Sequence, residues 1–532
     1  MTQCDVKWQA PRLGRNLTLA TVALAAAFAG CDGSSGGGTG GTATSSSTAS
    51  ASGSSSATST GSSATSTGSG GTGSGGASTG SGGTASTGSS SSSSGNACIS
   101  TPHQCTYGTG SGGADPMCPA GYADCNGSAG DGCETAIANN LYACGACGNQ
   151  CPGLVNPSHG TPVCAGGHCG FQCNVLFNDC NCDPSDGCES DALNDPQNCG
   201  GCGHVCSSGV CEQGLCKQTT CPVTDFVPQP SSMGVRWFSI HGGNIYWLQQ
   251  DAPVSPNVAG YSLHKMPLAG GADTTITTTA STPALTSGAF AGPMEIAADD
   301  DAITVLVPGG QLFRVPLAGG APTTLVTSTA SDAGALAVVG STAFWRQTPT
   351  TTPVQHTIAS VPIAGGTVQT IVTQDVADVG FAADAGYVYW LSNNDGSTVK
   401  KTPAGGGSDM VLGQVALANR MSANASDVFF AWGTTSPKAL PKAGGAPVTL
   451  GGKCGGQSSD TRLAIAASPT TVYWSRPKLQ QPNGTLLVST PVAGGGELLL
   501  ATETKTIYQI VADTTGVYYT LWEGSGIRKV CP

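Results

Sequence analysis

The chain has 532 residues and a formal net charge of −12; only 10% of its residues are charged, and 79 are glycine. The acidic balance argues against nucleic acid as a partner and against attraction to anionic lipid headgroups. Sparse charge and abundant glycine favour turn-rich extracellular β structure over a helical enzyme.

The N-terminus reads as an export signal over residues 1–30. Lys7, Arg12 and Arg15 precede an apolar run at 17–29, which is too short to span a bilayer comfortably. The run ends in "FAGC" at 28–31, which resembles the lipobox of bacterial lipoproteins, with Phe28 where leucine is usual. The resemblance implies cleavage before Cys31, acylation of Cys31 and a membrane partner through that lipid anchor. The alternative is an ordinary secretory signal followed by an incidental cysteine.

Residues 31–96 are expected to form a disordered tether. Positions 33–95 contain only Gly, Ser, Thr and Ala, so no side chain is large enough to offset the entropy of ordering. Such a tether has a root-mean-square span of roughly 45 Å. Export then places the mature protein in the cell envelope, at the outer membrane or the cell surface.

A cysteine-rich region follows over residues 97–221, with 20 of the 24 cysteines. Six of them recur at a constant offset of 55, and each copy closes with two more cysteines five apart, Cys164/Cys169 and Cys211/Cys216. The intervening residues also repeat, "DCNGSAGDGCE" against "DCNCDPSDGCE". The recurring set is Cys118, Cys125, Cys133, Cys144, Cys147 and Cys151, matched by Cys173, Cys180, Cys188, Cys199, Cys202 and Cys206.

Three chemistries fit this duplicated eight-cysteine module. Zinc would use the C-x-x-C pairs as thiolate ligands, and thioredoxin-like redox chemistry would place one pair beside a βαβ unit. Export, an even cysteine count and few large apolar residues favour a disulfide scaffold, in which no pairing is assigned. The module resembles Cys-rich repeats of predicted surface proteins in some Gram-negative soil bacteria, and the resemblance implies no activity.

Acidic and amide side chains recur inside the module and have two interpretations. Oxygen ligands at short spacing suit Ca²⁺, the one cofactor considered, whereas Asp and Asn also form turns by bonding nearby backbone groups. No complete EF-hand loop is present, which favours turns. The residues are Asp124, Asn126, Asp131 and Glu134, repeated as Asp179, Asn181, Asp186 and Glu189.

Residues 222–532 carry a different repeat. A P-x-A-G-G motif between two short apolar runs reads as a hairpin turn and occurs six times, at Pro267, Pro316, Pro362, Pro403 (a shifted variant), Pro441 and Pro491. An aromatic or apolar strand precedes each turn, and seven such strands begin at Ile245, Ile303, Ala343, Val388, Val428, Val472 and Val517. Four strands per unit at this period predict an all-β fold, a seven-bladed β-propeller, with six blades as the alternative.

The last unit has only three strands, so the ring needs a fourth from elsewhere. We expect "VTDFV" at 223–227 to supply it by antiparallel pairing with the final strand, since an open seam would expose strand edges. Cys221 and Cys531 flank the two strand ends, which predicts a disulfide between them. The alternative is a bond from Cys531 to Cys454, the other cysteine of the propeller segment.

The repeat resembles YWTD-type and NHL-type propellers. The Thr-Asp after Tyr-Trp is absent, because Leu248, Leu391 and Ser475 follow the three Tyr-Trp pairs. The resemblance therefore implies the fold and no ligand, and the aromatic residues are expected in the blade cores.

No catalytic residue is nominated. His241, His264 and His356 are far apart in the sequence, and Asp299–Asp301 suit a solvated turn better than a carboxylate site. The favoured function is a surface binding or adhesion protein whose propeller meets an extracellular protein or carbohydrate. The alternative is an envelope enzyme, a polysaccharide lyase or hydrolase, with residues carried on loops.

Overall fold

The computed structural model describes most of the chain after residue 116. The chain divides into two units, Met1–Gly88 and Ser89–Pro532, and every described residue belongs to the second unit. The expected signal, the tether and Cys31 lie outside the described residues, as does Cys454. The described ranges are 117–128, 130–152, 159–183, 186–228, 234–255, 258–279, 285–288, 294–307, 309–327, 330–349, 355–374, 376–392, 398–415, 420–432, 435–451, 464–479, 484–522 and 525–532.

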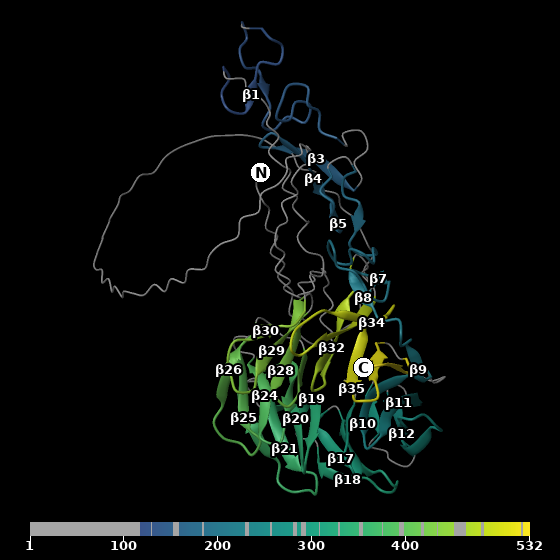
Figure 1. Cartoon of the computed structure of the whole chain (residues 1–532). Helices are drawn as coiled ribbons and strands as arrows, with labels where there is room; N and C mark the ends of the chain where they lie inside the picture. Colours follow the sequence, from purple (N-terminus) through teal and green to yellow (C-terminus); the bar gives the residue numbers. More distant parts are fainter. Residues whose placement is uncertain are drawn as a thin grey trace, which may run out of the picture. The chain divides into compact units, whose positions relative to one another are not determined.

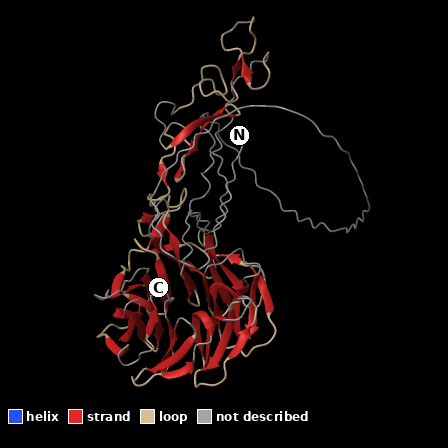
Figure 2. Ribbon diagram, turned by 180° about the vertical axis from the view of Figure 1, so that it is seen from behind, coloured by secondary structure: helices blue, strands red, loops and turns tan. Residues whose placement is uncertain are grey.

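The fold is all-β, and within these ranges no helix occurs that is long and apolar enough to traverse a bilayer. Seven antiparallel sheets are arranged as the blades of a propeller (Figures 1 and 2). The count confirms the seven-bladed prediction and excludes the six-bladed alternative. In blades 1 to 6 the four blade strands follow one another in chain order, whereas the last strand of blade 7 comes from before blade 1.

The first four blades run from residue 235 to residue 414. Blade 1 also holds β14 (Thr286–Gly288), which pairs with β12. The strands are, for blade 1, β10 (Val235–His241), β11 (Asn244–Ser255), β12 (Val258–Pro267) and β13 (Thr274–Thr278); for blade 2, β15 (Glu295–Ala298), β16 (Ala302–Val307), β17 (Gln311–Pro316) and β18 (Thr323–Val326); for blade 3, β19 (Ala330–Val339), β20 (Thr342–Pro349), β21 (Thr357–Pro362) and β22 (Gln369–Val372); for blade 4, β23 (Val376–Ala383), β24 (Tyr387–Ser392), β25 (Thr398–Pro403) and β26 (Met410–Gln414).

The remaining three blades complete the ring. Blade 7 takes one strand from before blade 1. The strands are, for blade 5, β27 (Arg420–Ala423), β28 (Asp427–Trp432), β29 (Thr435–Pro441) and β30 (Val448–Thr449); for blade 6, β31 (Ile465–Ala467), β32 (Thr471–Pro477), β33 (Thr485–Pro491) and β34 (Leu498–Thr502); for blade 7, β35 (Ile507–Ala512), β36 (Val517–Leu521), β37 (Ile527–Val530) and β9 (Thr224–Val227).

Two contacts close the ring between its ends. Strand β9 pairs antiparallel with β37, with Ile527 opposite Val227 and Lys529 opposite Thr224, as the sequence predicted. Cys221 forms a disulfide with Cys531, as predicted, and the alternative bond from Cys531 to Cys454 is therefore not formed. The first strands of neighbouring blades contact one another all the way round, including β35 with β10. The first strands therefore line the propeller axis.

Aromatic side chains of the second strands form the blade cores. Trp247, Trp345, Trp390 and Trp474 are at most 2% exposed. Blade 2 lacks this aromatic pair, and its core is filled from the third strand by Phe313, which lies opposite Val305 and is 1% exposed. The expectation that these residues are core, not platform, is confirmed.

The P-x-A-G-G motifs form the turns between third and fourth strands. In blade 1 the Gly270 N–H donates to the Pro267 carbonyl at 3.0 Å, and Gly270 has a φ of +89°. The other five copies repeat this bond. Left-handed φ is readily adopted only by glycine, which explains its invariable presence at this point of the six turns.

The cysteine-rich region consists of two modules with the same disulfide pattern. In each, the first cysteine bonds to the third, the second to the fifth, the fourth to the seventh and the sixth to the eighth. The bonds are Cys118–Cys133, Cys125–Cys147, Cys144–Cys164 and Cys151–Cys169, then Cys173–Cys188, Cys180–Cys202, Cys199–Cys211 and Cys206–Cys216.

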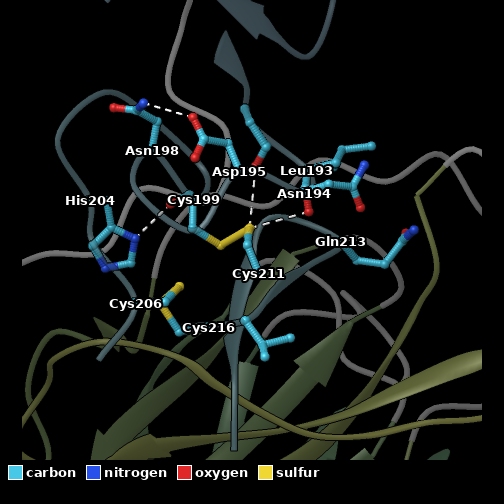
Figure 3. The surroundings of a disulfide bond; sticks show 12 residues. Leu193, Asn194, Asp195, Asn198, Cys199, His204, Cys206, Cys211, Gln213 and Cys216 are labelled. Carbon is cyan, nitrogen blue, oxygen red and sulfur yellow. Dashed lines mark hydrogen bonds between the residues drawn. A yellow bond between two sulfur atoms is a disulfide. The ribbon is translucent and has the colours of Figure 1, made fainter. Parts of the chain in front are cut away.

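Short antiparallel strand pairs occur between these disulfides in both modules. Near Cys199–Cys211, the His204 ring bonds the Cys199 carbonyl at 2.6 Å and Asn198 donates to Asp195 at 2.8 Å (Figure 3). The strands are β1 (Tyr122–Ala123), β2 (Thr135–Ala136), β3 (Gly160–Ala165), β4 (His168–Cys173), β5 (Phe177–Asn178), β6 (Ser190–Asp191), β7 (Cys211–Glu212) and β8 (Leu215–Lys217).

The second module adds a strand to the propeller. Strand β8 pairs parallel with β34, the outermost strand of blade 6, and Leu215 enters the core of that blade. Gln213 accepts a hydrogen bond from the Leu479 N–H at 2.8 Å, and its carbonyl accepts one from Arg476 at 3.2 Å. The module is thus hydrogen-bonded to blade 6 as well as joined to it through the chain.

Candidate functional site

The acidic residues of the modules form turns. In the first module Asp124 accepts the Gly127 N–H at 2.7 Å, Asn126 donates to Asp131 at 2.8 Å, and Glu134 accepts the Cys125 N–H at 3.0 Å. The second module repeats all three contacts. There Asp179 accepts the Cys182 N–H, Asn181 donates to Asp186, and Glu189 accepts the Cys180 N–H.

These contacts are those of the turn interpretation, since each named oxygen already holds a turn together. Among the described residues no three carboxylates bring their oxygens within 4.8 Å of one another. Calcium binding at these positions stays a prediction.

Sulfur atoms do gather closely, but as disulfides. The sulfurs of Cys144, Cys151 and Cys169 lie within 4.8 Å of one another, as do those of Cys199, Cys206 and Cys216. Each trio comes from two neighbouring disulfides. Zinc and thiol redox chemistry both need thiolates, so this arrangement fits a covalent scaffold.

The carboxylates at 299–301 brace one face of blade 2. Asp299 accepts the Asp301 and Ala302 N–H groups and binds Arg314 at 2.5 and 2.9 Å, while Asp300 lies 2.8 Å from the His241 ring. Burial alone would raise the pKa of Asp299, but the hydrogen bonds from Arg314 and the backbone hold that pKa below its ordinary value. The cluster is a structural turn, as expected.

His264 belongs to a constellation that the sequence did not reveal. Its Nε2 lies 2.8 Å from the Ser262 Oγ, and its Nδ1 lies 2.9 Å from Asp273. These are the partners of a serine-hydrolase triad. However, Ser262 is only 5% exposed, its hydroxyl donates to Asp251, and the His264 ring stacks on the buried Trp247. The constellation therefore ties the third strand of blade 1 to its neighbours.

A second set of side chains lies at strand ends on one face of the ring. On this face the first strand of each blade begins and the second strand ends, and we call it the entry face. The Ala-Gly-Gly turns lie on the opposite face, which we call the turn face. Glu295, Arg420 and Tyr508 lie at or next to the start of β15, β27 and β35. Trp237 is the third residue of β10. Together with Arg346, His356 and Trp522, these residues are named the axial mouth.

Glu295 is the partly buried negative group of the axial mouth. Its two oxygens accept the N–H groups of Ala335 and Leu336 at 2.9 and 2.8 Å, which holds a bulge in β19 where Ala335 has a φ of +55°. Removal of the carboxyl from water raises the pKa of Glu295, although these hydrogen bonds, Arg420 and Arg346 oppose the rise. The Glu295 carboxylate therefore stabilises the backbone of β19 in addition to carrying a negative charge when it is ionised.

Two arginines contribute positive charge that favours the ionised form of Glu295. Arg346 is 9% exposed and donates to the His356 Nδ1 at 3.0 Å, so Nδ1 acts as an acceptor. Arg420 belongs to blade 5, three places around the ring from Glu295 in blade 2, yet its charge acts on Glu295. Arg420 is partly exposed, and within the described part of the chain no hydrogen bond joins its guanidinium to another side chain.

Three partly exposed aromatic rings form the other part of the axial mouth. Tyr508 packs edge-on against Trp237 at 5.7 Å and tilted against Trp522 at 5.0 Å, measured between ring centroids. The Gln509 side chain fixes blade 7 to blade 1, since it bonds both the N–H and the carbonyl of Phe238 at 3.0 and 2.8 Å. This bridge lies directly beside Trp237 and Tyr508.

No family model and no curated protein matches the chain. The chain is similar to the solved structure of BamB from Moraxella catarrhalis, with 10% identity over 59% of this chain and 96% of that chain and a TM-score of 0.35. It is also similar to YCF48 bound to a D1 peptide (9%, 59% and 98%, TM-score 0.42) and to the computationally designed Ika8 protein (12%, 57% and 98%, TM-score 0.38). At such identities no family and no activity follow.

Proposed function

We propose that the chain is a cell-envelope lipoprotein whose propeller binds an extracellular protein or carbohydrate at the axial mouth. The observation that carries this proposal is a contrast in exposure. The tryptophans of the second strands are buried, whereas Trp237 and Trp522 are partly exposed beside the axis. Exposed aromatic rings together with arginine are typical of binding surfaces, because they offer large contact areas at low entropic cost.

The rest of the chain supports display of this head. Eight disulfides staple the two modules, which suits an oxidising compartment and a region with few large apolar residues. A lipid on Cys31 and a tether over 31–96 would then hold the modules and the propeller away from the membrane surface. Lipidation, export and the tether rest on the sequence pattern.

The enzyme alternative, a polysaccharide lyase or hydrolase, has weaker support. Most glycoside hydrolases use two carboxyl groups that flank the scissile bond. Within the described residues of the axial mouth, the carboxylate is that of Glu295, and both of its oxygens accept backbone hydrogen bonds. Binding needs only the aromatic faces and the positive charge of the axial mouth, whereas hydrolysis would also need a group that transfers a proton.

The test uses beads that carry the full mature protein and surfaces that are coated with envelope polysaccharides or extracellular proteins. The fraction of beads retained on each surface is measured. We expect retention on at least one surface, and loss of most of it in Tyr508→Ala. The matched control is Tyr387→Ala, a partly exposed tyrosine of blade 4 that begins β24 at the turn face. Equal retention of Tyr508→Ala and wild type would refute the proposal, as would no retention on any surface.

A further inference from the structure

We infer that the outer edge of blade 4 binds an extended, apolar segment of a partner protein, which pairs parallel with β26. This surface is separate from the axial mouth, because β26 is the last strand of its blade and the first strands line the axis. Figure 1 shows β26 on the rim of the ring, and no further strand of the described residues pairs with its outer edge.

Blade 6 shows how such an edge is filled in this molecule. Its last strand, β34, pairs parallel with β8, with Leu499 opposite Lys217. The Leu499 carbonyl accepts the Gln218 N–H at 2.8 Å. Leu215, the first residue of β8, lies in the same buried cluster as Leu499. The added strand therefore supplies both a main-chain hydrogen bond and an apolar cover.

The strand register identifies the equivalent positions in the other blades. In blade 6, Leu498 and Leu499 lie opposite the residues two and three places before the proline of the P-x-A-G-G motif. The same positions hold Met410 and Val411 in blade 4. In blades 1, 2, 3 and 5 at least one of the two residues is polar, so blade 4 has the edge that resembles the occupied edge of blade 6. Those four pairs are Thr274–Thr275, Thr323–Thr324, Gln369–Thr370 and Val448–Thr449.

The apolar side chains of blade 4 are exposed where their counterparts in blade 6 are covered. Val411 is 66% exposed, whereas Leu499 is 0% exposed. Val368 and Val448, on the outer sides of the neighbouring blades 3 and 5, are also exposed. Natural sheets commonly carry polar or charged residues on open edges, because an apolar edge invites pairing with another strand. Blade 4 departs from this rule, as an edge that receives a strand would.

The open part of this edge has the length of the pairing seen in blade 6. The Gly445 N–H of the next turn donates to the Leu412 carbonyl at 3.3 Å, so blade 5 already occupies the edge beyond Val411. Met410 and Val411 remain open, and their counterparts in blade 6 are the two residues that pair with β8. By this register the Val411 carbonyl corresponds to the Leu499 carbonyl, which accepts the N–H of the added strand.

Strand β8 defines the chemistry of the occupant. Leu215 directly precedes the two paired residues, and Gln218, three positions after Leu215, donates the N–H. A segment that fits blade 4 therefore needs a leucine or a similar aliphatic residue and, three positions later, any residue except proline, which has no N–H. Main-chain hydrogen bonds then give affinity, and the aliphatic side chain gives specificity.

A partner protein fits this description better than a second copy of the chain. Strand β8 of each copy is already bonded to its own blade 6. In the hairpin of the first module, the residue before the last cysteine is His168, where the second module has Leu215. Among the described residues, the first module's hairpin therefore lacks the leucine that covers the edge.

Fluorescence anisotropy with a labelled synthetic peptide tests the inference on the full mature protein. The probe has the sequence of residues 212–219 with Cys216→Ser, and blade 6 does not compete for it because its own β8 is tethered. We expect saturable binding to the wild type and about tenfold weaker binding to Val411→Lys, because an apolar contact is lost. The matched control is Thr370→Lys, the same edge position on blade 3, which should bind like the wild type.

Peptide variants and self-association complete the test. Leu215→Ser or Gln218→Pro in the peptide should weaken binding by a similar factor. Equal affinity of the wild type and Val411→Lys would overturn the inference, as would no binding at millimolar peptide. Sedimentation of the wild type as a dimer that Val411→Lys dissociates would assign the edge to a second copy and overturn the partner assignment. Thermal unfolding verifies that Val411→Lys is folded.

Discussion

At the scale of single residues, charged side chains of the propeller such as Asp299 and Glu295 stabilise the fold through hydrogen bonds or ion pairs. Asp299 closes a turn and holds Arg314, and Glu295 holds the bulge at Ala335. Arg420 differs, because within the described residues its guanidinium makes no such bond. Sequence alone could not separate these roles, because Asp299 and Glu295 act on residues 15 and 40 positions away.

The Asp299–Arg314 pair predicts a pH-dependent loss of stability in Asp299→Asn. The pKa of Asp299 is depressed in the folded protein, so its stabilising effect is complete above the ordinary value of 3.8 and is lost as the pH falls through the depressed pKa. We expect a loss of about 2 kcal/mol at pH 7 and a narrowing gap to wild type below pH 3.8. Thermal unfolding at several pH values measures this.

The control for that variant is its neighbour. Asp300 is 94% exposed at its side chain and pairs with His241, so Asp300→Asn should change stability far less. An equal loss in both variants, or a gap for Asp299→Asn that persists unchanged in acid, would contradict the assigned role of Asp299.

At the scale of elements, the repeat pattern predicted much of the architecture. Seven aromatic or apolar strands correspond to seven blades, because each second strand needs large side chains between two neighbouring sheets. The closing strand was predictable because a three-stranded last blade leaves an unpaired edge. The disulfide pairs inside the modules were not predictable, because eight cysteines allow many pairings and their spacing does not select one. The Ser262, His264 and Asp273 constellation was also missed, since strand geometry and not a motif brings it together.

Closure predicts that loss of the Cys221–Cys531 bond destabilises the whole propeller. The bond spans 310 residues, so in the chain-entropy model its removal costs up to about 5 kcal/mol. We expect the double variant Cys221→Ser/Cys531→Ser to show a lower propeller unfolding temperature. The double variant Cys180→Ser/Cys202→Ser is the control, because that bond spans 22 residues inside one module. A lower unfolding temperature of the propeller in the control variant alone would refute this prediction.

At the scale of the whole molecule, the axial mouth exists only because the ring closes. Trp237 and Tyr508 belong to blades that meet at the closure, and they are separated by more than half of the chain. Arg420 begins β27, the first strand of blade 5, which lines the same axis. No local pattern marks these residues, which is why the sequence predicted a binding head without its site.

Export predicts the covalent state of the mature protein. Mass spectrometry of material from the native envelope should find residues 1–30 removed, lipid on Cys31, and the module cysteines oxidised in the pairs of the two repeats. The reason is that an oxidising compartment converts clustered thiols into disulfides. Recovery of the protein with reduced thiols or with stoichiometric zinc would be incompatible with surface display.

The most direct test of the central claim is hydrogen exchange of the full mature protein with and without a surface component that retains the protein in the bead assay. A ligand at the axial mouth should slow exchange in peptides that contain Trp237, Arg420 and Tyr508, and leave peptides of the Ala-Gly-Gly turns unchanged. Slowed exchange confined to the turn face or to the cysteine modules, with none at these three residues, would contradict the account.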